Sequence, residues 1–101
     1  MQEKVTYFDG LLESWPAADP INGIEALEYI MHTGETPSPV APFQDGQEYH
    51  IKSGTLWVKT GLNEEYKPYS PGEVCKIQPN TPAIWLKVKN GITNYLRVRS
   101  N

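Results

Sequence analysis

The sequence has few of the residues that several classes of protein depend on. It contains one cysteine, Cys75, among 101 residues, which excludes an internal disulfide and a zinc site built from several cysteines. No apolar stretch approaches the roughly 20 residues that span a bilayer, and the first residues lack the long apolar core of a signal peptide. We therefore expect a cytoplasmic protein with no membrane partner.

Positive charge is also scarce. Nine Lys and Arg stand against twelve Asp and Glu, which gives a formal net charge of −3, and the basic residues form no cluster. Nucleic-acid binding depends on concentrated Lys and Arg, so we expect no nucleic-acid partner. The 39% of hydrophobic residues is typical of a globular protein, and a chain of 101 residues is too short for two independently stable cores.

Turn-forming residues are plentiful. Nine prolines and eight glycines divide the chain into short segments and leave little room for long helices. Two of these turns, Ser53–Gly54 and Asn90–Gly91, are flanked by segments rich in β-branched and aromatic residues. Because Gly supplies the positive φ of a tight turn, both predict β-hairpins. The four flanking segments are residues 48–52, 55–59, 84–89 and 92–99.

Three other segments complete the expected secondary structure. Ser70–Pro71–Gly72–Glu73 fits a type II turn, with Pro and Gly at its two central positions, and leads into a short strand over 74–77. Residues 24–32 fit either a helical stripe or a strand, and their short length between glycines favours a strand. Residues 8–18 have room for one helical turn. The chain is therefore predicted to be all-β, a sandwich or barrel of six or more short antiparallel strands.

The order of these segments resembles the cupin family. Three stretches carry the resemblance, namely residues 31–37, which resemble a preceding Gly turn, residues 48–58, which resemble the first half of the core, and residues 69–83, which resemble the second motif. The resemblance covers residues 23 to 99. It implies a small antiparallel β-barrel, a jelly roll, over residues 23–101, with residues 1–22 as an N-terminal extension that packs on it.

The resemblance also places the metal ligands of the family on this sequence. Counted from the glycines of the two motifs, the histidines of the first motif fall on Ala41 and Phe43, and its acidic or amide position falls on Gln47. The histidine of the second motif falls on Ala83. Methyl and phenyl groups offer no lone pair, and Gln47 alone cannot hold a divalent metal, which needs three or four ligands. We therefore expect no metal and no other cofactor.

The histidines and the cysteine that are present give weaker signals. On a strand, Gln47, Tyr49 and Ile51 share one face and His50 takes the other, so we expect His50 at the surface or in an interface. The role of His32 stays open. Cys75 lies within a predicted strand, which favours a buried, unreactive thiol over a nucleophile.

The candidate ligand-binding residues are Gln47, Tyr49, Trp85 and Lys87. Trp85 and Lys87 share a strand face with Ala83, which the resemblance places at the barrel mouth. Lys at an inward position is costly unless it is paired or faces a cavity, and a position at the surface or the sheet edge is the alternative. The aromatic rings either stack on a ligand or fill a small core.

Two functional classes remain open. The first is a metal-free cupin-like protein that binds or isomerises a small polar metabolite, including a carbohydrate, in the barrel cavity. The second is a non-catalytic module that binds carbohydrate or protein, or assembles, through exposed aromatics and strand edges. No catalytic residue is assigned. In either class we expect a homodimer, since a small barrel leaves strand edges to cover, with residues 23–29 and the C-terminal strand as its interface.

Overall fold

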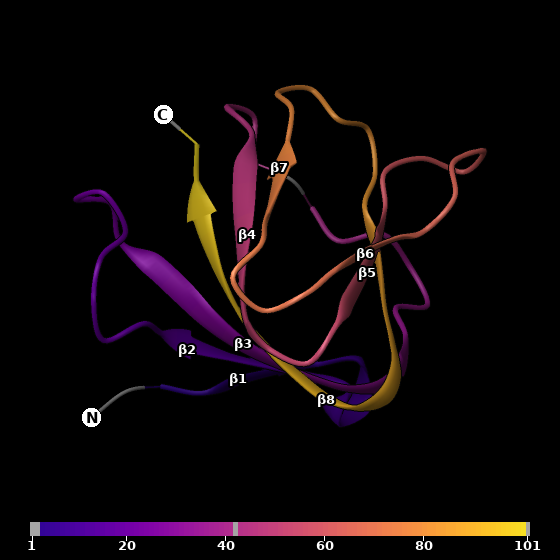
Figure 1. Ribbon diagram of the computed structural model, residues 1–101, viewed down its shortest axis with the longest axis horizontal. Coiled ribbons are helices and arrows are strands. Elements are labelled where there is room, and N and C mark those ends of the chain that lie inside the picture. The colour runs from indigo at the N-terminus through magenta and orange to yellow at the C-terminus, as the bar shows by residue number, and fades with distance from the viewer. Residues whose placement is uncertain (1–2, 42, 101) are drawn as a thin grey trace.

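The computed structural model describes residues 3–41 and 43–100, which form one antiparallel sheet that curls into an open barrel (Figure 1). Its strands confirm the predicted all-β, jelly-roll fold. In chain order they are β1 (Val5–Tyr7), β2 (Leu12–Pro16), β3 (Ala26–Glu35), β4 (Gln47–Ser53), β5 (Leu56–Lys59), β6 (Lys67–Tyr69), β7 (Val74–Ile77) and β8 (Trp85–Arg99), with one 3₁₀ turn, η1 (Phe8–Gly10), after β1. No helix of the described residues is long and apolar enough to cross a membrane.

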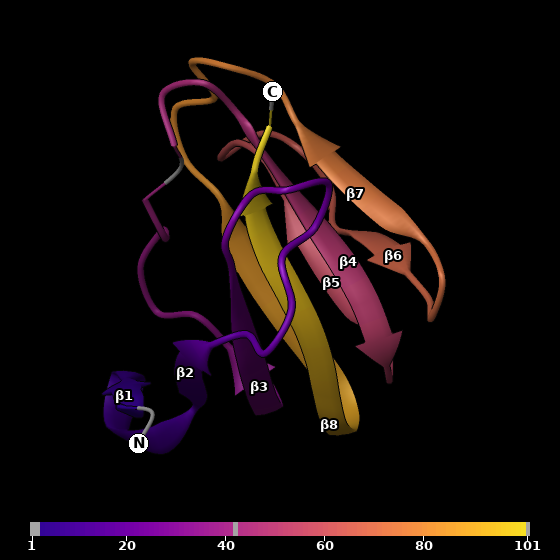
Figure 2. The same cartoon turned by 90° about the vertical axis from the view of Figure 1, so that its left-hand side faces the viewer.

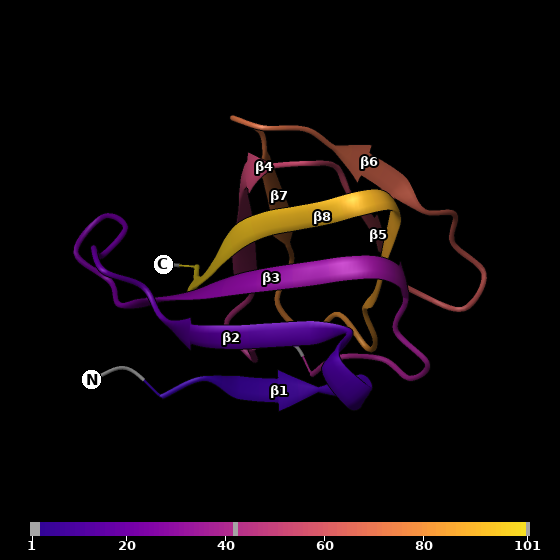
Figure 3. The same cartoon turned by 90° about the horizontal axis from the view of Figure 1, so that it is seen from below.

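The long strand β8 organises the sheet. The strand order is β1-β2-β3-β8-β4-β7, and Figure 3 shows β1, β2, β3 and β8 side by side. The second half of β8 pairs with β4, and β4 pairs in turn with β7 (Figure 2). The first half of β8 pairs with β5, and β5 pairs in turn with β6. Since β3 pairs with both halves of β8, the two parts of the barrel share these two strands.

Alternation along the strands fills the interior. In β4, Gln47, Tyr49 and Ile51 are buried while Glu48 and His50 are partly exposed, which confirms the predicted faces of this strand. The buried cluster combines aromatic and aliphatic side chains from both halves of the barrel. Its members are Leu12, Tyr29, Met31, Tyr49, Ile51, Leu56, Val58, Cys75, Ile77, Ile84, Leu86, Val88 and Tyr95.

Both predicted hairpins are wrong. β4 and β5 do not pair with each other, because each pairs with a different half of β8. Asn90–Gly91 lies within β8, which continues as one strand, and β3 runs along both of its halves with a register shift between His32 and Gly34. Gly54 and Gly91 have φ angles of +78° and +70°. These positive angles turn the strands through corners of the barrel instead of reversing them.

The other predicted local elements, two strands, a turn and one helical turn, are present in the structure. The strand predicted over residues 24–32 is confirmed from Ala26 onward, since β3 runs from Ala26 to Glu35. The Glu73 amide donates to the Ser70 carbonyl at 2.9 Å, which confirms the turn, and the strand predicted over 74–77 is β7. The predicted helical turn is η1, three residues long.

The N-terminal segment extends the sheet. β2 pairs with β3 over five residues, and β1 pairs with β2 at the outer edge. The boundary expected between residues 22 and 23 falls within the tight turn Ile21–Ile24, which joins β2 to β3 and is closed by two hydrogen bonds of 2.9 Å.

Candidate ligand-binding pocket

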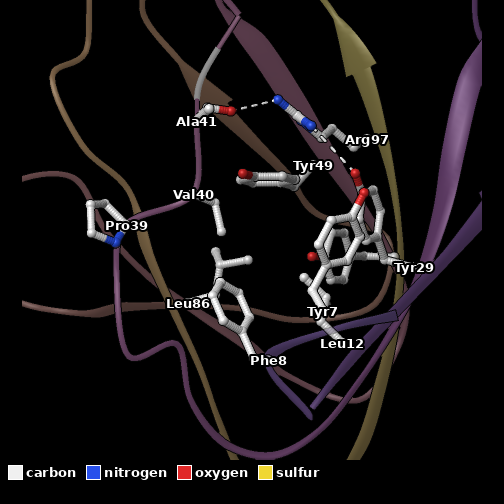
Figure 4. A pocket seen from close by; sticks show the side chains of 11 residues that line it. Tyr7, Phe8, Leu12, Tyr29, Pro39, Val40, Ala41, Tyr49, Leu86 and Arg97 are labelled. Atoms are coloured by element: carbon white, nitrogen blue, oxygen red, sulfur yellow. Dashed lines mark hydrogen bonds between the residues drawn. The ribbon is translucent and has the colours of Figure 1, made fainter. Parts of the chain in front are cut away.

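A cavity of about 320 Å³ lies between the barrel interior, η1 and the segment around Val40 (Figure 4). This volume is at the lower end of the range of small-molecule sites. Figure 4 shows Arg97, Tyr29 and Tyr49 at one end of the pocket and Phe8 and Leu86 at the other. The complete lining is Tyr7, Phe8, Leu12, Tyr29, Pro39, Val40, Ala41, Tyr49, Leu86, Tyr95 and Arg97.

Arg97 supplies the positive charge of the pocket. Its guanidinium donates through Nε to Gln47 Oε1 (3.0 Å), through Nη1 to the Tyr29 hydroxyl (3.3 Å) and through Nη2 to the Ala41 carbonyl (2.7 Å). The Phe43 ring lies 4.0 Å from the guanidinium carbon. The ion pairs of the described residues involve Lys4, His32, His50 and Lys52, and none involves Arg97. The guanidinium is therefore held in place by neutral groups, and its charge remains available to a ligand.

Gln47 lies behind the wall of the pocket. It is completely buried, and its Oε1 accepts hydrogen bonds from the Phe43 amide (3.2 Å) and from Arg97. Its Nε2 donates to the Tyr49 hydroxyl at 2.6 Å. Every polar group of this side chain is thus engaged, as buried polar groups usually are. Of the two predicted site residues on β4, Tyr49 faces the pocket and Gln47 positions Tyr49 and Arg97.

Three tyrosines pack against one another beside Arg97. The rings of Tyr29 and Tyr95 stack with centroids 5.0 Å apart, and Tyr49 meets Tyr95 edge to face at 5.4 Å. Both geometries are favourable for aromatic pairs. Burial raises the pKa of Tyr49 and of Tyr95 above the ordinary value of a phenol, so both hydroxyls are protonated at neutral pH.

The structure does not bring Trp85 and Lys87 together with Gln47 and Tyr49. In the first half of β8 the buried residues are Leu86 and Val88, so Trp85 and Lys87 lie on the opposite face. There Lys87 Nζ lies 5.5 Å from the centroid of the Tyr66 ring. The prediction that Trp85 and Lys87 converge with Gln47 at the barrel mouth is therefore wrong.

The physical reason is a change of phase along β8. Thr93 and Tyr95 point inward after the corner at Gly91, whereas Leu86 and Val88 point inward before it. The corner shifts the alternation by one residue. Arg97 shares the inward face with Tyr95, since the two residues are two positions apart on one strand. Arg97 was not among the predicted site residues, although alternation counted from Tyr95 indicates its inward position.

The positions that correspond to metal ligands in the family resemblance have other contacts here. Ala41 accepts a hydrogen bond from Arg97, Phe43 stacks on its guanidinium, and Ala83 is partly exposed. Across residues 3–41 and 43–100, no three His, Cys, Asp or Glu side chains gather closely enough to hold a metal ion.

The two histidines and the cysteine are not among the residues that line the pocket. His50 is partly exposed on the outer face, as the alternation predicted, and its Nε2 lies 2.8 Å from Glu48 Oε1, within hydrogen-bond distance. His32 Nε2 lies within hydrogen-bond distance, 3.0 Å, of Glu13 Oε2, and this contact links β3 to β2. Cys75 is 2% exposed, and burial raises the pKa of its thiol, so the prediction of a buried thiol is confirmed.

Comparison with known proteins shows a fold and no family. No family model and no curated protein matches the sequence. A solved protein of unknown function from Vibrio parahaemolyticus has a TM-score of 0.77 and 24% identity, with 97% of each chain covered. A DUF1255 protein of unknown function from Acinetobacter sp. ADP1 has a TM-score of 0.75 and 17% identity, covering 99% of this chain and 91% of that one.

A third solved structure connects the chain to the cupins. A cupin-like protein from Thermotoga maritima has a TM-score of 0.69 and 12% identity, covering 94% of this chain and 75% of that one. At these identities the likeness concerns the fold alone. The chain thus has a cupin-like jelly-roll fold, and its function has to be argued from its own residues.

Proposed function

We propose that this protein binds a small polar organic molecule in the pocket beside Arg97. The observation that carries the proposal is a guanidinium on the pocket wall that has no carboxylate partner among the described residues. The other end of the pocket is lined by Phe8, Leu12 and Leu86, which suit an apolar or flat body. A cytoplasmic metabolite with a polar head, including a sugar acid or a keto acid, matches this combination.

A screen of sugars, sugar acids and keto acids by thermal shift, followed by calorimetric titration, tests the proposal. Arg97→Met removes the charge at the pocket, and Lys87→Met is a matched control that removes a charge from the outer face of the same strand. Hydrogen bonds to charged groups contribute about 1.5–3 kcal/mol, so we expect Arg97→Met to weaken binding at least about tenfold. Lys87→Met is expected to bind like the wild type. The proposal fails if no compound stabilises the wild type, or if all three proteins bind equally.

We propose further that two copies pair through the outer face of β3 and β8. This face carries the partly exposed apolar side chains of Ile30 and Leu96, and Ile92 is 52% exposed beside them. Glu28 on this face is paired with Lys52, and His50 is paired with Glu48, so these acidic groups already have partners within each copy. This face includes the start of β3 and the end of β8, which are the segments expected from the sequence.

A further inference from the structure

The hydrogen-bond directions around the pocket are fixed by groups that can only donate. Gln47 Oε1 receives the backbone N–H of Phe43 and Nε of Arg97, and neither donor can act as an acceptor. These two donors determine which end of the amide is the oxygen. The amide nitrogen must therefore face Tyr49, where Nε2 donates to the hydroxyl at 2.6 Å.

The tyrosine hydroxyls therefore act as acceptors toward Gln47 and Arg97. The Tyr49 oxygen accepts from Gln47, and the Tyr29 oxygen accepts from Arg97 at 3.3 Å. A phenol has one O–H donor, and among the described residues neither of these two hydroxyls donates to an acceptor. Their protons are therefore free for a group in the pocket.

Tyr95 adds a third donor. This residue is 1% exposed and lines the pocket, and its hydroxyl makes no hydrogen bond within the described residues. No fully enclosed side-chain nitrogen or oxygen of those residues lacks a partner. The Tyr95 hydroxyl is therefore not fully enclosed, and Tyr95 lines the cavity. A hydroxyl that has no protein partner at a cavity wall is available to donate to a group bound in the cavity.

We infer that the pocket selects its ligand through an oxyanion, a carboxylate or a phosphonate-like group that accepts hydrogen bonds from Arg97 and from the tyrosine hydroxyls of Tyr29, Tyr49 and Tyr95. This inference rests on the proposed function and names the chemical class of the ligand. Because the phenols are protonated at neutral pH, they offer protons and no negative charge. An ammonium group would meet the guanidinium and the O–H donors and would be repelled. A neutral alcohol can accept hydrogen bonds from these donors, but it is not attracted by the positive charge of the guanidinium and should bind more weakly than an anion.

Four small probes with a common phenyl ring separate the alternatives. They are benzoate, phenylphosphonate, benzyl alcohol and benzylamine, titrated at pH 7 into the full chain and followed by calorimetry and by NMR. We expect at least one of the two anions to bind about tenfold or more tightly than benzyl alcohol, with benzylamine the weakest. The better anion distinguishes a carboxylate ligand from a phosphorus oxyanion.

The outcomes of the titration distinguish this inference from the proposed function. Equal binding of benzylamine and benzoate, or binding of none of the four probes, overturns the oxyanion inference. If a sugar or keto acid from the screen still binds in an Arg97-dependent manner, the proposed function stands. If nothing in the screen binds either, both fail.

A conservative variant tests the role of Tyr95. Tyr95→Phe removes a hydroxyl without a protein partner, so the midpoint of unfolding should stay close to that of the wild type. Binding of the better anion should weaken about five- to tenfold. The matched control is Tyr66→Phe, which removes a hydroxyl that donates to Glu35 at 2.8 Å outside the pocket and should leave binding unchanged. Equal affinities of the two variants would remove Tyr95 from the site.

Discussion

Gly54 lies against the backbone carbonyl of Ile92, at the point where the chain after β4 and the strand β8 turn corners together. A Cβ placed on Gly54 would lie 2.6 Å from the Ile92 oxygen and 2.9 Å from the Thr93 Cα. Thr93 Oγ1 also donates to the Thr55 carbonyl at 2.8 Å across the same corner. The close approach of two backbones, more than the turn itself, therefore requires glycine here.

Substitution of two glycines with similar φ angles separates these effects. Gly54→Ala adds both backbone strain and a clash, whereas Gly91→Ala adds strain alone, because a Cβ there meets nothing within 4 Å. We expect Gly91→Ala to lower the free energy of unfolding by about 1 kcal/mol and Gly54→Ala by more than about 2 kcal/mol. Urea unfolding of both variants measures the difference. Equal losses would show that the corner can relax around a methyl group.

Stability should depend on the charge of Glu28. Burial raises the pKa of this carboxyl, but the hydrogen bonds from Lys52 and Asn94, each 3.1 Å long, outweigh burial and hold the pKa below its ordinary value. The unfolded state therefore binds the proton more readily. The stabilising contribution is present above the ordinary pKa of a glutamate and is lost as the pH falls through the lowered folded-state pKa.

We expect Glu28→Gln to remove this dependence. Wild type and variant should differ most near pH 7, by up to about 1 kcal/mol, and should converge toward pH 3. Urea midpoints measured at several pH values check this. A difference that grows as the pH falls would contradict the assignment.

Cys75 should react slowly in the folded protein. The thiol is buried and its pKa is raised by burial, so both access and thiolate formation are suppressed. We expect a chromogenic disulfide reagent at pH 8 to label the native protein slowly and the urea-unfolded protein quickly. Rapid labelling without denaturant would show that β7 opens readily.

The proposed dimer interface can be disrupted at one residue. Leu96→Glu places a charge on the outer face of β8, so a wild-type dimer should become a monomer in light scattering coupled to size exclusion. Leu62→Glu is the control, since Leu62 is 79% exposed in the loop between β5 and β6. A monomeric wild-type mass over a wide range of concentration would refute the dimer.

The protein is predicted to carry no stoichiometric transition metal. Ala41, Phe43 and Ala83 stand where the cupin resemblance places histidines, and none of these side chains offers a lone pair. Elemental analysis after dialysis should therefore find far less than one metal per chain. A content of about one metal per chain would contradict both the alignment and the expected absence.

Local patterns in the sequence determined most of the strands. Period-2 alternation of β4, the Ser70–Glu73 turn and the strand that follows it are consequences of neighbouring residues alone, and all three were predicted. The buried state of Cys75 was expected because this residue lies within a predicted strand, which is β7. The order of the motifs was sufficient to predict a cupin-like barrel.

Only the tertiary structure decided what the glycine turns do and which residues meet in the pocket. Asn90–Gly91 has the same local preference for positive φ in a hairpin as in a corner, and the pairing of both halves of β8 with β3 selects the corner. That choice shifts the alternation along β8, turns Trp85 and Lys87 outward and leaves Arg97 beside Tyr49. Since strand pairing over long sequence distances sets the phase, residues near one strand alone could not reveal the site.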